Sequence, residues 1–359
     1  MRRRGTSASG GGPGPASGGG AGSGGARVSG EGAASGAGAG SGGSGVDLST
    51  EVGPVRLDNP VMTAAGTAGH GAELGAYFRL SDLGAVVVKS LAAGPWPGNP
   101  SPRVCPVPGG MLNGVGLQGP GVEAWGETEL PALVASRAKV VVSLWGRSTT
   151  EFAEAARLLA GVLAERDRSG AVVALEVNVS CPNLEDRSRM FAHSPSATAE
   201  AVAAVATALP QLPLFAKLSP NTSELVEVAG AALSAGAAGL TLVNTLLGLA
   251  IDLDRRAPAL GGVGGGLSGP ALHSVALRAV YECRRAYPSA GIVGVGGIST
   301  GEGAMRMLVA GADAVQVGTA TLADPRAPVQ VLGELRERLE KEGVRSVREI
   351  VGAAQEPGA

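Results

Sequence analysis

Residues 291–319 read GIVGVGGISTGEGAMRMLVAGADAVQVGT and combine two apolar runs with a segment of helical character. The first run ends in Gly296 and Gly297, the helical segment covers 299–312, and the second run, AVQVGT, covers 314–319. Two strands joined by a helix form the β–α–β unit of a parallel sheet, and such strands are apolar along most of their length because both faces are buried. This pattern predicts an α/β fold.

The same alternation extends back along the chain through six further apolar runs. Helical segments separate them, among them 149–167, with Thr149 or Thr150 as the expected N-cap, and 221–237. Eight β/α units in about 300 residues favour a (β/α)8 TIM barrel. A doubly wound sheet would place a GxGxxG turn after its first strand, whereas the glycine-rich strand ends here come late, where barrels bind phosphate. The six runs are VMTAAG (61–66), AVVVKS (85–90), KVVVSL (139–144), VALEVNVS (173–180), LFAKLS (214–219) and GLTLVNT (239–245).

The bulk composition limits the class of protein. The formal net charge of the 359-residue chain is −2, which gives no indication of a nucleic-acid or membrane-surface partner. No apolar run reaches the roughly 18 residues of a membrane-spanning helix. Cys105, Cys181 and Cys283 form no CxxC pair, so we expect no metal site in this chain and a reducing, cytoplasmic location.

The N-terminal segment, residues 1–46, differs in kind from the rest because it is nearly all Gly, Ser and Ala. It has too little apolar surface to offset its chain entropy, so we expect a disordered tail. The opening MRRR precedes no apolar run, which argues against a signal peptide. Residues 47–354 are expected to form one barrel domain.

Polar residues follow most of the predicted strands, at the end of a barrel where catalytic residues gather. Lys89 and Lys217 would be costly near the barrel axis unless each meets an anion or an acceptor. The N–H groups of the turns at 296–297 and 318–319 can hold a phosphate, and asparagines offer the donors and acceptors that a planar heterocycle needs. Together these features predict a phosphorylated cofactor or substrate.

Each feature has a simpler explanation when it is taken alone. A lysine after a strand is often a surface residue, a glycine turn is common in barrels, and a lone cysteine such as Cys181 is usually buried and inert. His70, His193 and His273 are expected to be structural or exposed. The joint pattern at one end of the barrel, rather than any single residue, favours a functional site.

Several stretches together resemble the dihydroorotate dehydrogenases, which are flavin enzymes of pyrimidine biosynthesis. The resemblance covers residues 47–354, and its most specific motifs are NVSCPN at 178–183 and the Asn-x-x-Gly-Leu loop that begins at Asn113. The stretches that carry it are NPVMTAAGTAG (59–69), VVVKS (86–90), GNPSPR (98–103), LNGVGLQGPGVEAW (112–125), NVSCPN (178–183), FAKLSPN (215–221), LVNTLLG (242–248), GGLSGPAL (265–272), IVGVGGIST (292–300) and AVQVGTA (314–320).

The resemblance implies FMN, bound flat at the mouth of the barrel. Lys217 would stabilise negative charge at the N1/O2 edge of the reduced flavin. The third strand end, where the family usually carries Asn, has Ser143 here. The residues expected to hold FMN are Ala65, Gly66, Thr67, Lys89, Ser90, Ser143, Asn178, Lys217, Val243, Gly269, Gly296, Gly297, Gly318 and Thr319.

The resemblance also implies the reaction, which is oxidation of (S)-dihydroorotate to orotate on the route to UMP. Cys181 would be the general base that takes the proton from C5 while hydride passes from C6 to N5 of FMN, with Lys89 as the second catalytic residue. A thiolate suits this role because free cysteine has a pKa of about 8.5, which a nearby lysine lowers. The residues expected to hold the substrate are Lys89, Asn113, Gly116, Leu117, Asn178, Asn183, Asn244 and Thr245.

Cys181 also points to the class of enzyme within this family. Cysteine at that position is typical of the soluble class 1 enzymes, whereas the membrane-bound class carries serine. Class 1 relatives are homodimers or larger assemblies, and the NAD-linked ones use a second subunit that carries FAD and a 2Fe–2S cluster. Other relatives use fumarate, so the sequence leaves the electron acceptor open.

Two departures from the family pattern keep other functions open. Residues 184–195 read LEDRSRMFAHSP where class 1 enzymes have a glycine-rich continuation, and Gly114 and Gly119 stand where Ala and Asn are common. One alternative is an FMN oxidoreductase acting on another dihydropyrimidine. The other is a non-catalytic barrel subunit.

Overall fold

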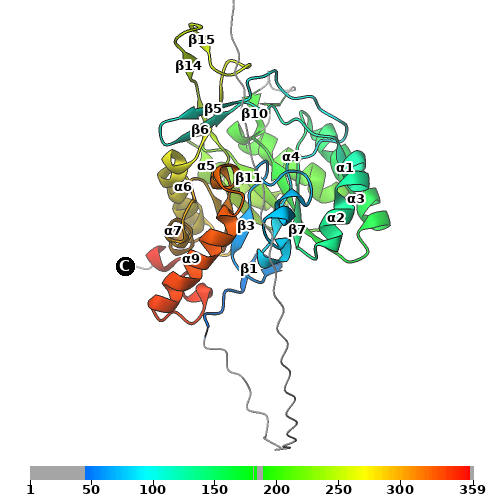
Figure 1. Ribbon diagram of the computed structural model, residues 1–359. Helices are drawn as coiled ribbons and strands as arrows, with labels where there is room; N and C mark the ends of the chain where they lie inside the picture. Colours follow the sequence, from blue (N-terminus) through cyan, green and yellow to red (C-terminus); the bar gives the residue numbers. More distant parts are fainter. Residues whose placement is uncertain (1–44, 181, 184–188, 356–359) are drawn as a thin grey trace, which may run out of the picture. The chain divides into compact units, whose positions relative to one another are not determined.

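The computed structural model of the protein describes residues 45–180, 182–183 and 189–355 (Figure 1). At its centre, eight parallel strands form one sheet, and their order around the sheet is the same as their order along the chain. Each of the eight predicted runs coincides with one of these strands to within one residue at its start, so the predicted barrel is confirmed. The strands are β3 (Val61–Thr63), β4 (Val86–Val87), β7 (Val140–Leu144), β8 (Val172–Asn178), β11 (Leu214–Leu218), β12 (Gly239–Leu242), β17 (Gly291–Val295) and β18 (Ala314–Val317).

The sheet closes on itself between its first two strands. The last strand, β18, pairs with β3, where Val315 lies opposite Val61. A parallel bridge between Met62 and Ala85 then joins β3 to the start of β4, and the Thr63 N–H donates to the Ala85 carbonyl at 3.3 Å. Because every strand runs in the same direction, all eight carboxyl ends lie on one rim.

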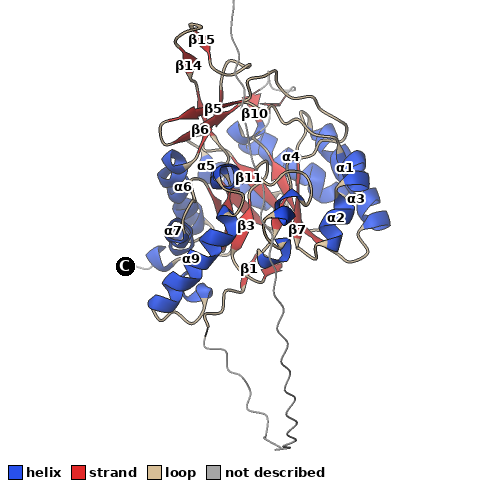
Figure 2. Ribbon diagram, in the orientation of Figure 1, coloured by secondary structure: helices blue, strands red, loops and turns tan. Residues whose placement is uncertain are grey.

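Helices surround the barrel (Figure 2). Helix α3 begins one residue after Ser148, whose hydroxyl accepts from the Glu151 N–H at 3.2 Å. The expected N-cap at Thr149 or Thr150 is therefore wrong, because Ser148 is the last residue with an extended backbone. The α-helices are α1 (Val122–Thr128), α2 (Leu130–Ala135), α3 (Thr149–Arg166), α4 (Pro195–Ala208), α5 (Leu225–Ser234), α6 (His273–Ala286), α7 (Gly301–Ala310), α8 (Thr319–Ala323) and α9 (Ala327–Lys341).

Helix α5 starts later than the predicted segment 221–237. The side chain of Asn221 accepts from the Leu247 N–H at 2.8 Å and donates to the Thr245 carbonyl at 3.0 Å. A short polar side chain that bonds the backbone in this way competes with helix formation. Asn221 therefore joins the loop after β12 to the loop after β11.

An antiparallel hairpin, formed by β1 (Thr50–Val52) and β2 (Val55–Leu57), closes the lower end of the barrel. Val52 and Leu57, each 1% exposed, belong to the apolar cluster that fills that end together with Phe215. A second, larger cluster lies between the outer face of the barrel and the helices. The sequence patterns did not single out this hairpin, because its strands are only three residues long.

A small antiparallel sheet lies over the opposite end of the barrel, near the strand-end rim (Figure 1). Its order is β13-β16-β6-β5, so the insertions after the second and sixth barrel strands meet in it. Its strands are β5 (Val104–Val107), β6 (Gly110–Asn113), β13 (Leu246–Gly248) and β16 (Gly265–Ser268), and the remaining short pairs are β14 (Ile251–Asp252) with β15 (Ala257–Pro258) and β9 (Pro182–Asn183) with β10 (Arg189–Met190).

Candidate active site

A buried charged network fills the middle of the barrel. Lys217 Nζ lies 3.3 Å from Glu176 Oε1, and Gln316 donates from Nε2 to Glu176 Oε2 at 3.0 Å. Glu176 is fully buried, and Lys217 and Gln316 are 5% and 1% exposed. The acceptor that Lys217 was expected to need is therefore, at least in part, a carboxylate of the protein itself.

Sequence reasoning did not identify Glu176 as part of the site. The signal was present, because alternation along VALEVNVS places Glu176 on the same face of its strand as Asn178. A carboxylate in an otherwise apolar strand must meet a partner. Phe215 on β11 lies directly opposite Glu176, and Lys217, two residues further along β11, provides that partner.

At the rim, polar side chains from four strand ends form a hydrogen-bonded chain. Ser90 Oγ lies 2.8 Å from Ser143 Oγ, and Asn178 donates from Nδ2 to Ser90 Oγ at 3.3 Å. Asn244 in turn donates from Nδ2 to Asn178 Oδ1 at 3.1 Å. The structure thus brings together predicted site residues from the second, third, fourth and sixth strands, and Ser143 is fully buried among them.

Lys89 connects this rim to the loop that follows β6. Its ammonium group donates to the Gln118 carbonyl, and Asn113 at the start of the loop donates to the Gly266 carbonyl at 3.3 Å. Burial, and then the charge of Arg103, lower the pKa of Lys89. A lysine held in this way is half-buried beside the loop that was predicted to bind substrate.

The loop has an unusual backbone, because Gly116 and Leu117 both have positive φ values, 71° and 62°. Leucine rarely adopts this conformation, so the loop is held there by its surroundings. The N–H groups of Val115, Gly116 and Leu117 have no acceptor among the described residues. Consecutive unpaired N–H groups can bind an anion.

The glycine turns after β17 and β18 fit a phosphate group. A Cβ atom at Gly297 would lie 2.8 Å from the Gly269 carbonyl oxygen, so the close backbone approach there requires glycine. The N–H groups of Gly297 and Gly318 find no acceptor in the described part of the chain. By contrast, a Cβ atom at Gly66 on the same rim would meet no atom within 4 Å, which leaves open space beside the first strand end.

The other predicted residues lie on or near this rim with less specific contacts. Thr67 bonds its own turn through the Ala64 carbonyl at 2.9 Å, and Val243 is buried with its N–H on the Val295 carbonyl at 2.9 Å. Cys181 and the side chain of Asn183 lie outside the described residues, as does 184–188. The remaining predicted positions come shortly after barrel strands or after strands of the small antiparallel sheet, here called the top sheet. They are Ala65, Gly269, Gly296, Thr245 and Thr319.

The three histidines are not exposed. Each has a buried Nε2 atom without a hydrogen-bond partner in the part of the chain that the structure describes. His273 places Nδ1 3.1 Å from the Gly296 carbonyl, beside a glycine turn of the site. Burial, and then the charge of Lys89, lower the pKa of His70.

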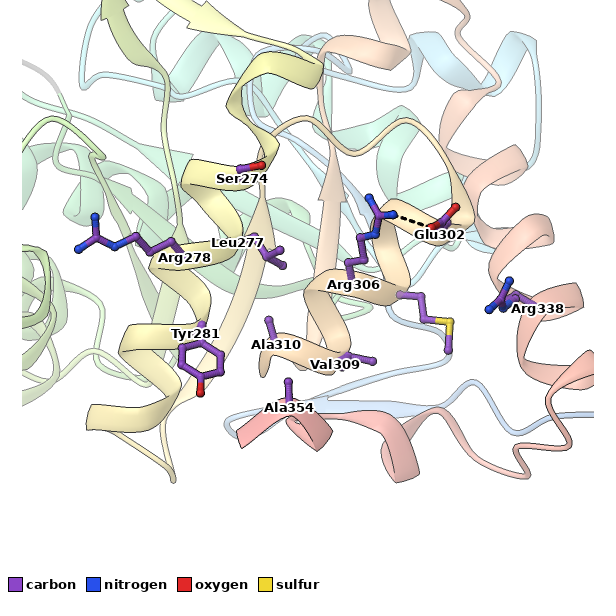
Figure 3. A pocket seen from close by; sticks show the side chains of 11 residues that line it. Ser274, Leu277, Arg278, Tyr281, Glu302, Arg306, Val309, Ala310, Arg338 and Ala354 are labelled. Atoms are coloured by element: carbon purple, nitrogen blue, oxygen red, sulfur yellow. Dashed lines mark hydrogen bonds and ion pairs between the residues drawn. The ribbon is translucent and has the colours of Figure 1, made fainter. Parts of the chain in front are cut away.

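A pocket on the outside of the barrel, between α6 and α7, contains none of the predicted site residues (Figure 3). Leu277, Met305 and Val309 form much of its lining, and Arg306 at its edge pairs with Glu302 at 2.6 Å. It therefore lies apart from the strand-end rim and its chemistry.

Comparison with known proteins identifies the family. A sequence profile of dihydroorotate dehydrogenase matches residues 47–339, which is most of the chain. The chain belongs to the dihydroorotate dehydrogenase family. The catalytic subunit of dihydroorotate dehydrogenase B (NAD(+)) from Geotalea daltonii is 43% identical over 307 residues, covering 86% of this chain and 98% of the relative. The corresponding subunit from Alkaliphilus metalliredigens is 43% identical over 308 residues, covering 86% and 99%.

A solved structure agrees with this assignment at the level of the fold. Dihydroorotate dehydrogenase from Eimeria tenella, in complex with ferulenol, superposes with a TM-score of 0.71 and 21% identity. The match covers 87% of this chain and 89% of that one. The resemblance to class 1 dihydroorotate dehydrogenases is therefore confirmed, and the chain is an oxidoreductase that converts dihydroorotate to orotate in pyrimidine biosynthesis.

The described residues contain neither a membrane-spanning helix nor a cluster of metal ligands. None of the described helices is both long enough and apolar enough to cross a bilayer. Nor does the described part contain a group of three or more His, Cys, Asp or Glu residues placed to hold a metal ion.

Replacing Glu176 by Ala is expected to lower the free energy of unfolding by about 3–5 kcal/mol, because Lys217 would stay buried without its carboxylate. Urea titration at neutral pH measures the change. Glu282→Ala is the matched control, since it breaks a pair with Arg278 whose side chains are 39% and 77% exposed, and we expect a loss below about 1 kcal/mol. Equal losses in the two variants would contradict the importance of the buried pair.

The pH dependence of stability tests the environment of His70. Its pKa lies below the unfolded value of about 6.5, so the unfolded chain binds the proton more readily than the folded one. The free energy of unfolding should therefore fall as the pH drops from about 7.5 to about 5.5. In His70→Asn this fall should be smaller, as measured by urea titration at both pH values. An unchanged fall in the variant would show that His70 does not cause it.

Proposed function

We propose that this dihydroorotate dehydrogenase uses FMN, with Cys181 as the base that receives the C5 proton on its sulfur. When bound, FMN supplies the acceptor for the hydride that leaves C6. The observation that carries the proposal is the rim itself, where Lys89, a row of unpaired N–H groups and the Asn178–Asn244 pair lie around one barrel mouth. These groups suit a planar, anionic substrate.

The residues present fit the cofactor. The unpaired N–H groups of Gly318 and of Gly297, which shortly precedes α7 in the chain, suit its phosphate. Open space beside Gly66 and the buried Lys217 suit its ring system. The remaining residues expected to hold FMN lie along the same strand ends.

The substrate would bind through its charge and its amide edges. Its carboxylate suits the N–H groups of Gly116 and Leu117 together with the Lys89 ammonium group. The amide edges of its ring suit Asn113, Asn178, Asn244 and the side chain of Asn183. In this arrangement Lys89 also stabilises negative charge near the reacting atoms, which is its proposed catalytic role.

We infer that electrons leave through a partner subunit that carries FAD and a 2Fe–2S cluster, with NAD as the final acceptor, and that the enzyme works in the cytoplasm. Relatives named as catalytic subunits of an NAD(+) enzyme support this inference.

Burial raises the pKa of the Cys283 thiol to about 12, so Cys283 is an inert core residue.

A row of exposed apolar side chains supports a homodimer. Leu247, Leu249, Ile251 and Leu253 alternate along the chain from β13 into β14, and they are 58%, 56%, 53% and 82% exposed. The segment 247–258, which includes the β14–β15 pair, is here called the arm. A two-stranded arm is marginally stable in water on its own, and apolar patches on soluble proteins commonly mark interfaces. The exposed arm carries charges of both signs, such as Asp254 and Arg256, which favours a second copy of the same chain as the occupant.

Anaerobic addition of dihydroorotate to the purified, flavin-loaded enzyme is expected to bleach the visible flavin absorbance in proportion to the substrate added. Cys181→Ser should retain flavin but reduce it about 100-fold more slowly or worse at neutral pH, because a hydroxyl is a far weaker base. Stopped-flow absorbance measures both rates. Cys105→Ser is the control, since Cys105 lies on β5 outside the proposed site, and it should reduce at the wild-type rate.

The outcomes separate the parts of this proposal. Equal rates in wild type and Cys181→Ser would remove Cys181 from the mechanism. A yellow protein that bleaches only with another dihydropyrimidine would favour the alternative substrate, and a protein without flavin would favour a non-catalytic barrel.

The dimer is tested by its mass in solution. Analytical ultracentrifugation should find wild type as a dimer and Leu253→Asp as a monomer, because a carboxylate would be buried at the interface. Leu322→Asp is the matched control, since Leu322 on α8 is 55% exposed but lies outside the arm. A monomeric wild type, or a Leu253→Asp variant that stays dimeric, would contradict an interface at this arm.

A further inference from the structure

The loop of residues 113–119, here called the substrate loop, is hydrogen-bonded along one side by an outer segment. The Trp96 and Gly119 backbones exchange two hydrogen bonds, at 2.9 and 3.0 Å. Asn99 donates its backbone N–H to the Val115 carbonyl and its side-chain Nδ2 to the Gly114 carbonyl, both at 3.0 Å. The Trp96 indole N–H donates to the Gly116 carbonyl at 2.9 Å.

These contacts determine the direction of the free N–H groups. The peptide bonds of the substrate loop are trans, so each N–H points opposite to the carbonyl of the preceding residue. The carbonyls of Gly114, Val115 and Gly116 all point toward Trp96 and Asn99. The N–H groups of Val115, Gly116 and Leu117 therefore point to the opposite side of the loop, where none of them meets an acceptor among the described residues.

One of these peptides depends on a single side chain. The Gly116 carbonyl accepts from the Trp96 indole, and the N–H of the same peptide belongs to Leu117. Gly116 and Leu117 both have positive φ, so this peptide lies at the point where the backbone departs most from ordinary geometry. Without the indole donor, its carbonyl would have no protein partner in the described part of the chain, and its orientation would be less restricted.

Trp96 is itself fixed from outside the loop. The Arg147 guanidinium carbon lies 4.6 Å from the centre of the Trp96 ring, within the range of a cation–π contact. Glu151 holds that guanidinium at 2.7 Å, and the ring of Trp145 meets Trp96 edge-on at 5.8 Å. The indole is therefore held in place by residues that follow β7, on the neighbouring barrel unit.

We propose that Trp96 is a positioning residue for substrate: its indole, held under Arg147, orients the Gly116–Leu117 peptide so that the Leu117 N–H meets the substrate carboxylate. The inference rests on the proposed function of the substrate loop. Trp96 acts through the loop and does not itself contact the reacting atoms. It therefore affects the binding of the anionic substrate rather than the chemical step.

Trp96→Phe tests this because it keeps an aromatic ring under Arg147 and removes only the donor. The KM for dihydroorotate and the Kd for orotate should both rise about fivefold to tenfold, since one hydrogen bond is lost and its acceptor is left unpaired. The kcat and the flavin content should stay close to wild type. Steady-state kinetics gives the KM and kcat, and the flavin difference spectrum on titration with orotate gives the Kd.

Two further variants complete the design. Trp125→Phe is the control, because its indole N–H donates to the His70 carbonyl at 2.7 Å, outside the loop, and its orotate affinity should stay near wild type. Arg147→Met removes the cation above the Trp96 ring and should weaken orotate binding about twofold to threefold. It also tests the proposal independently if Trp96→Phe does not fold.

The outcomes are distinct. Unchanged KM and orotate affinity in Trp96→Phe, or a loss confined to kcat, would overturn the role of Trp96 while leaving the proposed function intact. A wild-type enzyme that is reduced by dihydroorotate but whose orotate affinity is unchanged in both Trp96→Phe and Arg147→Met would likewise overturn the inference alone. A flavin-loaded wild type that neither binds orotate nor is reduced by dihydroorotate would overturn the proposed function and this inference together.

Discussion

Closure of eight parallel strands in chain order is the constraint on which this active site depends. Because every strand runs the same way, residues that follow strands far apart in the sequence become neighbours on one rim. Asn178 bonds Ser90 and Asn244 there, although 88 and 66 residues separate these pairs. The β1–β2 hairpin and the outer helices bury the apolar faces of the barrel, so the polar groups gather where the strands end.

The same closure places a charged pair in the centre of the barrel, where water does not compensate for a missing partner. Lys217 and Glu176 come from adjacent strands. Gln316, across the barrel, donates a hydrogen bond to the second oxygen of the Glu176 carboxylate. A buried pair of this kind is weak evidence for stability, but removal of either partner is costly. The charge of Lys217 is therefore held in a fixed position and is partly balanced by Glu176, which is the environment in which its proposed role toward FMN would be carried out.

The substrate loop shows a second way of holding polar groups. Its carbonyls are satisfied from the outer side by Trp96 and Asn99, which leaves its N–H groups available on the other side. The free N–H groups are thereby fixed in position, so the proposed binding of an anionic substrate would need little further ordering of the loop. The top sheet contributes to this arrangement because it anchors Asn113, at the start of the loop, to Gly266.

The sequence by itself determined the barrel, because buried parallel strands have a periodicity that is visible in each of the eight runs, and its local motifs determined the family. It also located Lys89, Asn178 and Asn244 correctly at strand ends, since those positions follow from where each run stops. Only the tertiary structure decided that Glu176 pairs with Lys217, that Asn221 shortens α5, and that Trp96 supports Gly116. These contacts join groups that are 20 or more residues apart in the sequence, and the partner that each side chain meets depends on strand register and loop path rather than on local pattern. The role of Cys181 stays a prediction from its motif.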